Sequence, residues 1–215
     1  MSLQALSSTS TDFLPSMRFH ARLGVFSRVD RALNAEGKWE SSLTDINDAL
    51  ASEGALVDLT NIKLGWLKFD GGVDIQVQHH SLPAIPQPSN NHKDGLMLEI
   101  WLPKTVSDGS PLREFSHTAA GVKNAVNDLH TAWERGAENI DSAEREAGEI
   151  VPLIKIGVEP FSTKNGVFQK PVFTIAGWLP RPVEWGMPAP VGAAPAPPQM
   201  AVAPASPAGD DDLPF

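Results

Sequence analysis

The sequence contains no cysteine and no tyrosine, and none of its apolar runs reaches the roughly 20 residues that a membrane-spanning helix needs. Without cysteine the chain has no disulfide framework, no thiol nucleophile and none of the common structural zinc sites. This composition fits a reducing compartment, and the start of the chain lacks the basic and apolar stretches of a signal peptide. We therefore expect a cytoplasmic protein without membrane contact, in which only Trp, Phe, His or Arg can stack on a planar ligand.

Acidic and basic residues are distributed unevenly along the 215 residues. The totals are 17 basic and 26 acidic residues, and the resulting net charge of −9, taken alone, argues against nucleic acid. By position, residues 17–31 hold four arginines and one aspartate, whereas residues 134–149 hold six acids and two arginines. Three more aspartates stand at 210–212. The chain therefore begins with a basic segment, and much of its acid lies in one central stretch and at the carboxyl end.

Composition divides the chain into four parts. Apolar residues make up 41% of the chain, enough for residues 13–185 to form one domain with a buried core, behind a flexible segment at 1–12. Residues 186–209 contain no charged residue and seven prolines among 24 residues, which is typical of a solvated, disordered linker. Residues 210–215 form an acidic tip.

Hydrophobic patterns within residues 13–185 predict a mainly β domain with one main helix. Val122, Val126, Leu129 and Trp133 are spaced as on one face of a helix, which we expect over residues 112–135. We expect a short helix at 43–51 and a kink at Gly24 in the first strand. The expected strands are residues 17–29, 55–69 (as one strand or two), 73–77, 96–102, 150–158 and 171–178.

This order of elements predicts an oligonucleotide/oligosaccharide-binding (OB) fold. That fold is a five-stranded Greek-key barrel, and its helix lies between the third and fourth strands. β-Sandwiches and other α+β folds give similar strings of elements, so the pattern leaves them open as alternatives.

The sequence carries no motif of a catalytic or cofactor site. It has no phosphate-binding P-loop, no dinucleotide-binding glycine fingerprint and no strained serine elbow. His79 and His80 are adjacent, so on a strand they point to opposite faces and do not predict a metal site. The acids at 134–149 lie on or beyond the expected helix as a solvated run. We expect no enzyme activity, no cofactor and no metal.

Cations and flat side chains alternate in the basic segment, and this combination binds single-stranded nucleic acid without sequence preference. If residues 17–23 are extended, Arg18, His20 and Arg22 share one face while Phe19 points to the core. The pattern is repeated further along the chain, both in the second strand region and in a hairpin-like loop at 162–171. The candidate DNA-binding residues are Arg18, His20, Arg22, Phe26, Arg28, Trp39, Trp66, Lys68, His92, Lys93, Lys155, Lys164, Phe168 and Lys170.

Some of these aromatic residues have core packing as an alternative, since most Trp and Phe side chains of such a domain are buried. Trp101 lies in an apolar run and Trp133 on the apolar face of the expected helix, so we assign both to the core.

The chain ends in a compact motif of six residues: Asp210, Asp211, Asp212, Leu213, Pro214 and Phe215. A terminal phenylalanine offers an apolar ring and a free α-carboxylate, which fit a small apolar pocket with an Arg or Lys at its mouth. The three aspartates add attraction toward a basic surface, and Pro214 restricts the backbone before the ring. These features predict a partner-binding tip.

The DDDLPF ending after a Pro/Ala-rich linker resembles the carboxyl-terminal tip of bacterial single-stranded-DNA-binding proteins, with leucine where isoleucine is more usual. The segments RVDR (28–31), LGWLKF (64–69), HKDG (92–95) and REFSHTA (113–119) are similar to bacteriophage-encoded members of that class. The resemblance implies binding of single-stranded DNA in replication, recombination or repair, in a bacterial cell or a phage-infected host. It also implies partners that read the tip, of the helicase, primase, exonuclease or polymerase type, and leaves open a homo-oligomer.

Two other functions fit the same sequence. One is an adaptor without a DNA site, which would use the tip only to dock on replication or recombination enzymes. The other is an enzyme of DNA metabolism that carries the same tail, and the absence of catalytic motifs argues against it.

Overall fold

The computed structural model describes residues 15–68, 74–78, 86–136, 140–164 and 166–185. The predicted flexible start at 1–12, the linker at 186–209 and the tip at 210–215 lie outside the described residues, as do His79 and His80. The strands are β1 (Ser16–His20), β2 (Val25–Leu33), β3 (Trp39–Asp45), β4 (Ala55–Val57), β5 (Lys63–Lys68), β6 (Asp74–Gln78), β7 (Lys93–Trp101), β8 (Leu112–His117), β9 (Ile150–Thr163) and β10 (Gly166–Pro180). The helices are α1 (Asn47–Ser52), α2 (Lys104–Ser107), α3 (Ala120–Arg135), α4 (Ser142–Glu146) and the 3₁₀ helix Val183–Trp185.

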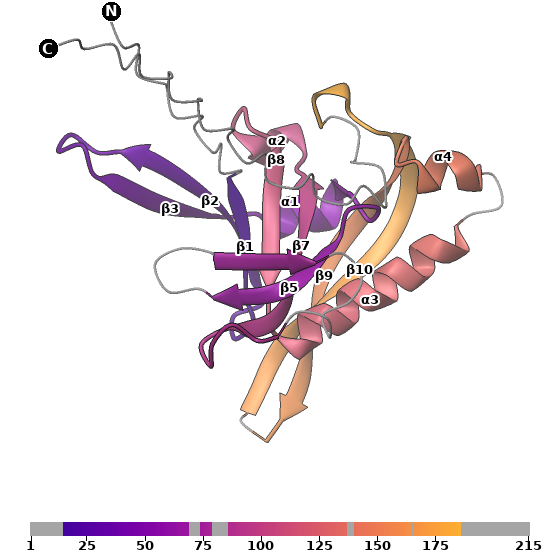
Figure 1. Ribbon diagram of the computed structural model, residues 1–215. Helices are drawn as coiled ribbons and strands as arrows, with labels where there is room; N and C mark the ends of the chain where they lie inside the picture. Colours follow the sequence, from indigo (N-terminus) through magenta and orange to yellow (C-terminus); the bar gives the residue numbers. More distant parts are fainter. Residues whose placement is uncertain (1–14, 69–73, 79–85, 137–139, 165, 186–215) are drawn as a thin grey trace, which may run out of the picture.

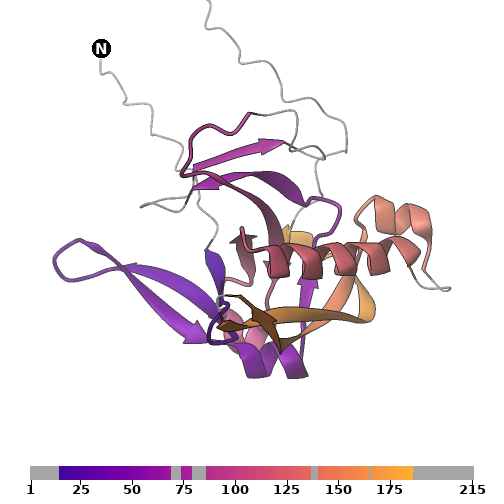
Figure 2. The same ribbon diagram turned by 90° about the horizontal axis from the view of Figure 1, so that it is seen from below.

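The strands form a mainly β structure whose sheet curls into an open half-barrel (Figure 1). Their order is β10-β9-β4-β7-β8-β1-β2-β3, and β5 pairs with both β6 and β7. β1 pairs parallel to β8, and the other pairs of described strands are antiparallel. α3 is the one long helix of the described chain, and the chain passes through it between β8 and β9. Seen from below, α3 runs across the molecule with β5 and β6 on one side and β9 and β10 on the other (Figure 2).

The prediction of one kinked strand over residues 17–29 is wrong, because these residues form two antiparallel strands, β1 and β2. The amide of Gly24 donates to the carbonyl of His20 (2.9 Å), which closes a tight turn over residues 21–24. Gly24 has φ +69°, a conformation that glycine adopts without steric cost, and it therefore reverses the chain instead of bending it.

Both predicted helices begin too early. Residues 112–117 form β8, in which Arg113 and Phe115 are buried with the period of two that a strand requires, and α3 begins only at Ala120. The helical spacing of the predicted apolar positions is confirmed, because Val122, Val126, Leu129 and Trp133 are buried along α3. The short helix α1 begins at Asn47, since residues 43–45 continue β3 along β2. The 55–69 segment forms two strands, β4 and β5.

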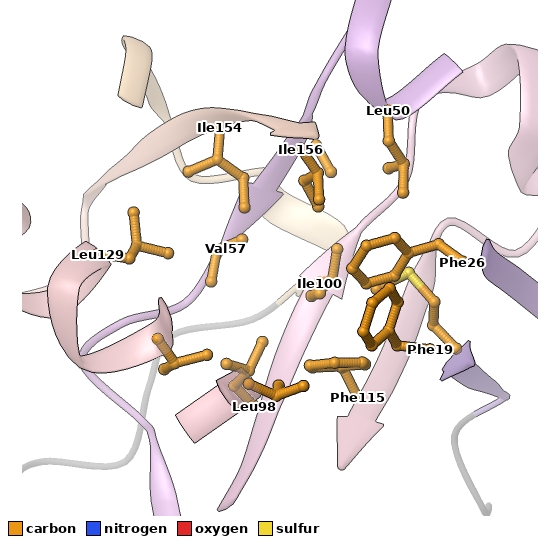
Figure 3. Close-up of a cluster of buried hydrophobic side chains, with 14 of the residues drawn as sticks. Phe19, Phe26, Leu50, Val57, Leu98, Ile100, Phe115, Leu129, Ile154 and Ile156 are labelled. Atoms are coloured by element: carbon orange, nitrogen blue, oxygen red, sulfur yellow. The ribbon is translucent and has the colours of Figure 1, made fainter. Parts of the chain in front are cut away.

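The main core lies inside the curl of the sheet, where aromatic rings gather at one end and aliphatic side chains at the other (Figure 3). The Phe19 and Phe26 rings are 4.5 Å apart between centroids, and the Phe26 and Phe115 rings are 6.0 Å apart. Ile154, from β9, and Leu129, from α3, close the aliphatic end. Phe19 and Trp133 are buried, as predicted, and Trp101 is partly buried.

A buried arginine holds the β2 strand against β8. Arg113 is 1% exposed, and its guanidinium forms an ion pair with Asp30 (3.0 Å) and donates to the carbonyls of Val29 and Ser107 (3.2 Å each). Arg28 joins the same network through Asp30 (2.6 Å). Burial lowers the pKa of Arg113, and the Asp30 carboxylate opposes that shift. The network therefore fixes the β1–β2 hairpin, which we call the amino-terminal hairpin, to the body of the domain.

A second cluster of polar and aromatic side chains holds the end of the described chain against the sheet. We call this cluster the carboxyl-terminal clasp, and its members are Asp58, Glu99, Trp101, Arg181 and Trp185. Arg181 binds the fully buried Asp58 carboxylate (2.8 Å), and its guanidinium lies 4.7 Å from the centre of the Trp185 ring. The Trp185 indole stacks on Trp101 at 5.8 Å and donates to Glu99 (2.8 Å). These contacts anchor residues 181–185 to the sheet, directly before the linker.

His117 connects the end of β8 to the start of α3. Its Nδ1 accepts a hydrogen bond from the Ala119 amide (2.9 Å), and its ring also bonds the backbone of Phe19 in β1. Burial lowers the pKa of His117 below its ordinary value of 6.5, against the weaker opposing effect of the Phe19 bond. The folded protein thus holds His117 in the neutral form.

We expect the free energy of unfolding to fall as the pH drops through 6.5, because the unfolded chain binds a proton there that folded His117 resists. One such proton changes stability by at most about 1.4 kcal/mol per pH unit. Thermal unfolding between about pH 7.5 and about pH 6 measures the slope, and His117→Asn should flatten it. His130→Asn, which changes a partly exposed histidine of α3, is the control and should keep the slope. An equal slope in both variants would contradict this assignment.

Candidate nucleic-acid interface

The predicted alternation in β1 places two of the candidate residues on the surface. Arg18 and His20 are exposed, whereas Met17 and Phe19 between them are buried in the core. The alternation follows from the period of two in a strand, and it confirms the predicted placement of Phe19. β1 therefore presents a cation and an imidazole side by side at the surface.

The turn after β1 brings Arg22 to a distant part of the sequence. Its guanidinium lies 5.9 Å from the centre of the Phe168 ring of β10, and the Phe168 ring lies 6.1 Å from that of Phe161 of β9. Phe161 and Phe168 are paired in register and partly exposed. The structure thus joins Arg22 and Phe168, two predicted site residues, in one cluster with Phe161.

Phe161 is a site residue that the sequence reasoning missed. Phe161 is paired with Phe168 and Thr163 with Gly166, so this register is not centred on the Asn165-Gly166 pair, a typical two-residue hairpin signal. A turn at this pair would have given another register, so the sequence signal did not predict that the two rings are paired. The start of α3 backs this pair of rings, because a Cβ atom on Gly121 would lie 3.4 Å from Phe161 Cζ.

The cations of β1, of the turn after it and of the β9–β10 ribbon differ in whether a carboxylate already holds them. Lys170 is bound to Glu159 (2.7 Å), whose carboxylate raises the pKa of Lys170. Arg18, Arg22 and Lys164 are exposed and make no ion pair with any residue that the structure describes. These three cations are available to an anionic ligand, and we call them, with Phe161 and Phe168, the ribbon cluster.

A second group of candidates lies on β5 and β7. Trp66 and Lys68 are partly exposed and share one face of β5, as the alternation with buried Leu67 requires. Lys93, exposed, stands opposite Leu67 at the start of β7. Seen from below, β5 and the β9–β10 ribbon lie on opposite sides of α3 (Figure 2).

Three candidates have structural roles instead. Phe26 is 1% exposed in the core and cannot stack on a base. Arg28 is held by Asp30 and donates to the carbonyl of Val106 (2.6 Å). His92 is buried with its Nδ1 2.8 Å from Ser89 Oγ, where it orders the turn before β7. Phe26 and Arg28 have partners far away in the sequence, which local sequence does not reveal, whereas His92 is held by Ser89, three residues before it.

The remaining two candidates stand apart from both groups. Trp39 begins β3 and is paired in register with Leu33, at the far end of the projecting β2–β3 hairpin (Figure 1). Lys155 is exposed on β9, six residues before Phe161, which is about 20 Å along a strand.

The described residues offer little room for an enclosed ligand. A small hollow lined by Lys63, Glu99, Glu114 and their neighbours has a volume of about 50 Å³, room for water only, and burial raises the pKa of Glu114 there. Within the described ranges, no group of three or more His, Asp or Glu residues is placed to hold a metal ion. In the same part of the chain, no helix is long and apolar enough to cross a membrane.

Comparison with protein-family models, with curated proteins and with solved structures finds no match to this chain.

Replacing Phe168 with alanine removes the central ring of this cluster. Loss of one base-stacking ring is worth about 1–3 kcal/mol, so affinity for an oligo-dT strand should fall about 5-fold to 150-fold. Fluorescence anisotropy of a labelled oligonucleotide measures the change. Val167→Ala is the matched control, because this exposed neighbour lies on the opposite face of the strand. Equal affinity of the two variants would remove Phe168 from the site.

Proposed function

We propose that this protein binds single-stranded DNA without strong sequence preference and without enzymatic activity, and that it recruits partner proteins through residues 210–215. Arg18, Arg22 and Lys164 bind phosphates, while Phe168 and Phe161 stack bases. The proposal assigns the protein to replication, recombination or repair, in agreement with the resemblance carried by its tip.

One observation carries the proposal: exposed Arg22, which forms no ion pair with a described residue, lies 5.9 Å from the Phe168 ring, and the Phe161 ring lies 6.1 Å from that of Phe168. Phosphate needs the cations and the bases need the flat rings, and both must lie within the spacing of a nucleotide. A cluster that served only folding would be expected to pair its cations, as Arg28, Lys123 and Lys170 are paired.

The strand order supports an OB-fold as the framework. Taken in chain order, β4, β7, β8, β9 and β10 are five strands with α3 between the third and the fourth. In space they follow the order fifth, fourth, first, second, third, which is that of an OB barrel opened between its third and fifth strands. The β5–β6 hairpin then belongs to the first connection and the β9–β10 turn to the last, and OB-folds bind oligonucleotides with these loops and the second and third strands.

The tip supplies the second half of the proposal. Asp210, Asp211, Asp212, Leu213, Pro214 and Phe215 lie outside the described residues, so this half rests on their chemistry. A phenylalanine with its α-carboxylate fits an apolar pocket bordered by a cation, on a partner of the helicase, primase, exonuclease or polymerase type.

The deciding experiment is titration of the full chain with poly-dT at low salt, followed by tryptophan fluorescence and repeated at rising salt. Binding should quench the fluorescence, and the affinity should fall steeply as salt rises. No response at low salt would overturn DNA binding and favour the adaptor, which docks through the tip alone.

A further inference from the structure

The ends of the curled sheet are bridged by a turn. β10 is the terminal strand of the sheet and pairs with β9 alone among the described strands. On its open side, the Gln169 amide donates to the carbonyl of Ala21 (2.6 Å), in the turn that joins β1 to β2. The turn between β1 and β2 thus contacts β10, although four other strands lie between β10 and β1 in the order of the sheet.

Glycine at position 24 is what permits this approach. A Cβ atom on Gly24 would lie 2.9 Å from Gln169 Cγ, 3.2 Å from Gln169 Cβ and 3.4 Å from Val158 Cγ2. Its φ of +69° adds a backbone strain for any other residue. The turn and β10 are therefore packed as closely as their backbones allow, and we call residues 21–24 with Gln169 the turn latch.

The turn latch determines where Arg22 lies. Arg22 stands between Ala21, which accepts the Gln169 bond, and Gly24, which packs on the Gln169 side chain. Phe168 precedes Gln169, so the same two contacts place the Arg22 guanidinium and the Phe168 ring 5.9 Å apart. If the latch opens, the cation and the ring separate even though neither side chain has changed.

We propose that Gly24 and Gln169 are positioning residues for single-stranded DNA: the closed turn latch holds Arg22 beside Phe168, so that one nucleotide meets the cation with its phosphate and the ring with its base. The single-stranded DNA then lies across the closed turn latch, over both the β1–β2 hairpin and the β9–β10 ribbon. This inference rests on the proposed function and adds that the amino-terminal hairpin is part of the DNA site.

A disulfide provides a direct test, because the natural chain contains no cysteine. The Cβ separation of 3.2 Å between positions 24 and 169 is within a few tenths of an ångström of the roughly 3.5–4.5 Å found in disulfides. In the double variant Gly24→Cys/Gln169→Cys, oxidation joins the two positions by a disulfide and so closes the turn latch covalently. After reduction, the two separate cysteine side chains are crowded between the turn and β10, and they push the turn latch open. Gln169→Cys alone, measured with and without reductant, controls for the reductant.

The oxidised double variant should bind labelled oligo-dT within about twofold of the natural chain, and the reduced form about tenfold more weakly, the value of one charge-assisted contact. Reduction should also lower the slope of log affinity against log salt by about 0.7, since one phosphate contact is lost. A role confined to folding would leave this slope unchanged.

Gln169→Pro is a second variant that does not introduce cysteine. Proline removes the amide that donates to Ala21, and this amide points away from β9, so the ladder between β9 and β10 is kept. We expect the same tenfold loss and the same smaller salt slope, with near-native circular dichroism showing that the domain is folded.

Two outcomes would overturn the inference while the natural chain binds oligo-dT: equal affinity and slope in the oxidised and reduced forms, or loss of binding on oxidation. Loss of binding on oxidation would mean that DNA binds only when the turn latch is open. Absence of binding by the natural chain would overturn the proposed function, and this inference with it.

Discussion

The triple variant Arg18→Ala, Arg22→Ala and Lys164→Ala is expected to bind oligo-dT about 100-fold to 1000-fold more weakly than the natural chain at low salt. These cations are exposed and unpaired within the described chain, so each is free to displace a counterion from a phosphate. Losing three such contacts should lower the slope of log affinity against log salt by about 2, at roughly 0.7 per contact for a single strand. Anisotropy titrations at several salt concentrations measure both quantities.

A matched control removes the same net charge elsewhere. Lys38 at the end of the β2–β3 hairpin, Lys104 in α2 and Arg135 at the end of α3 are all exposed and belong to neither candidate group. Their triple alanine variant should keep most of the affinity, with a loss that reflects only long-range attraction. Equal losses in the two variants would show that total charge, not the ribbon cluster, determines binding.

The largest expected effect on stability follows from Asp58→Ala. Asp58 is fully buried, and its removal leaves the Arg181 guanidinium, 4% exposed, without its carboxylate. Removing one member of a buried ion pair costs about 3–5 kcal/mol, because the remaining desolvated charge loses its oppositely charged neighbour. For a domain of this size, thermal unfolding should begin roughly 10 °C lower.

An exposed pair provides the comparison. Glu36 and Lys38 are joined at 2.8 Å, yet both side chains are about 70% exposed. Glu36→Ala should therefore change the free energy of unfolding by at most about 1 kcal/mol. If Asp58→Ala is as mild as Glu36→Ala in urea or thermal unfolding, the clasp contributes little to stability.

Local periodicity was sufficient for the features that depend on neighbouring residues. Buried Phe19 between exposed Arg18 and His20, and the buried stripe along α3, follow from strand and helix geometry alone. The reversal at Gly24 was missed because a glycine in a strand pattern signals either a bend or a turn. Likewise, residues 112–117 carry too few alternations to separate a strand from the first turns of a helix.

Features that depend on tertiary partners could not be predicted in this way. Phe26 and Arg28 have the composition of a DNA-binding segment, but the Phe115 ring packs on Phe26, and Arg28 donates to the carbonyl of Val106. The meeting of Arg22 with Phe168 depends on Gln169 and Ala21, which lie in the last and first thirds of the domain. No local pattern relates such positions, so the sequence indicated Arg18, Arg22, Lys164 and Phe168 but neither Phe161 nor the arrangement of the ribbon cluster.

The parallel pairing of β1 with β8 has a consequence for the order of folding. Arg113 bonds the carbonyl of Val29 across 84 residues of sequence, and β1 must wait for β8 to exist before it can pair. At about 5–20 residues per second, a ribosome needs roughly 4–17 s to supply that stretch. The β1–β2 hairpin, the first to be synthesised, can therefore dock only after β8 is available, and because such non-local contacts form slowly, its attachment is expected to be a slow step of folding.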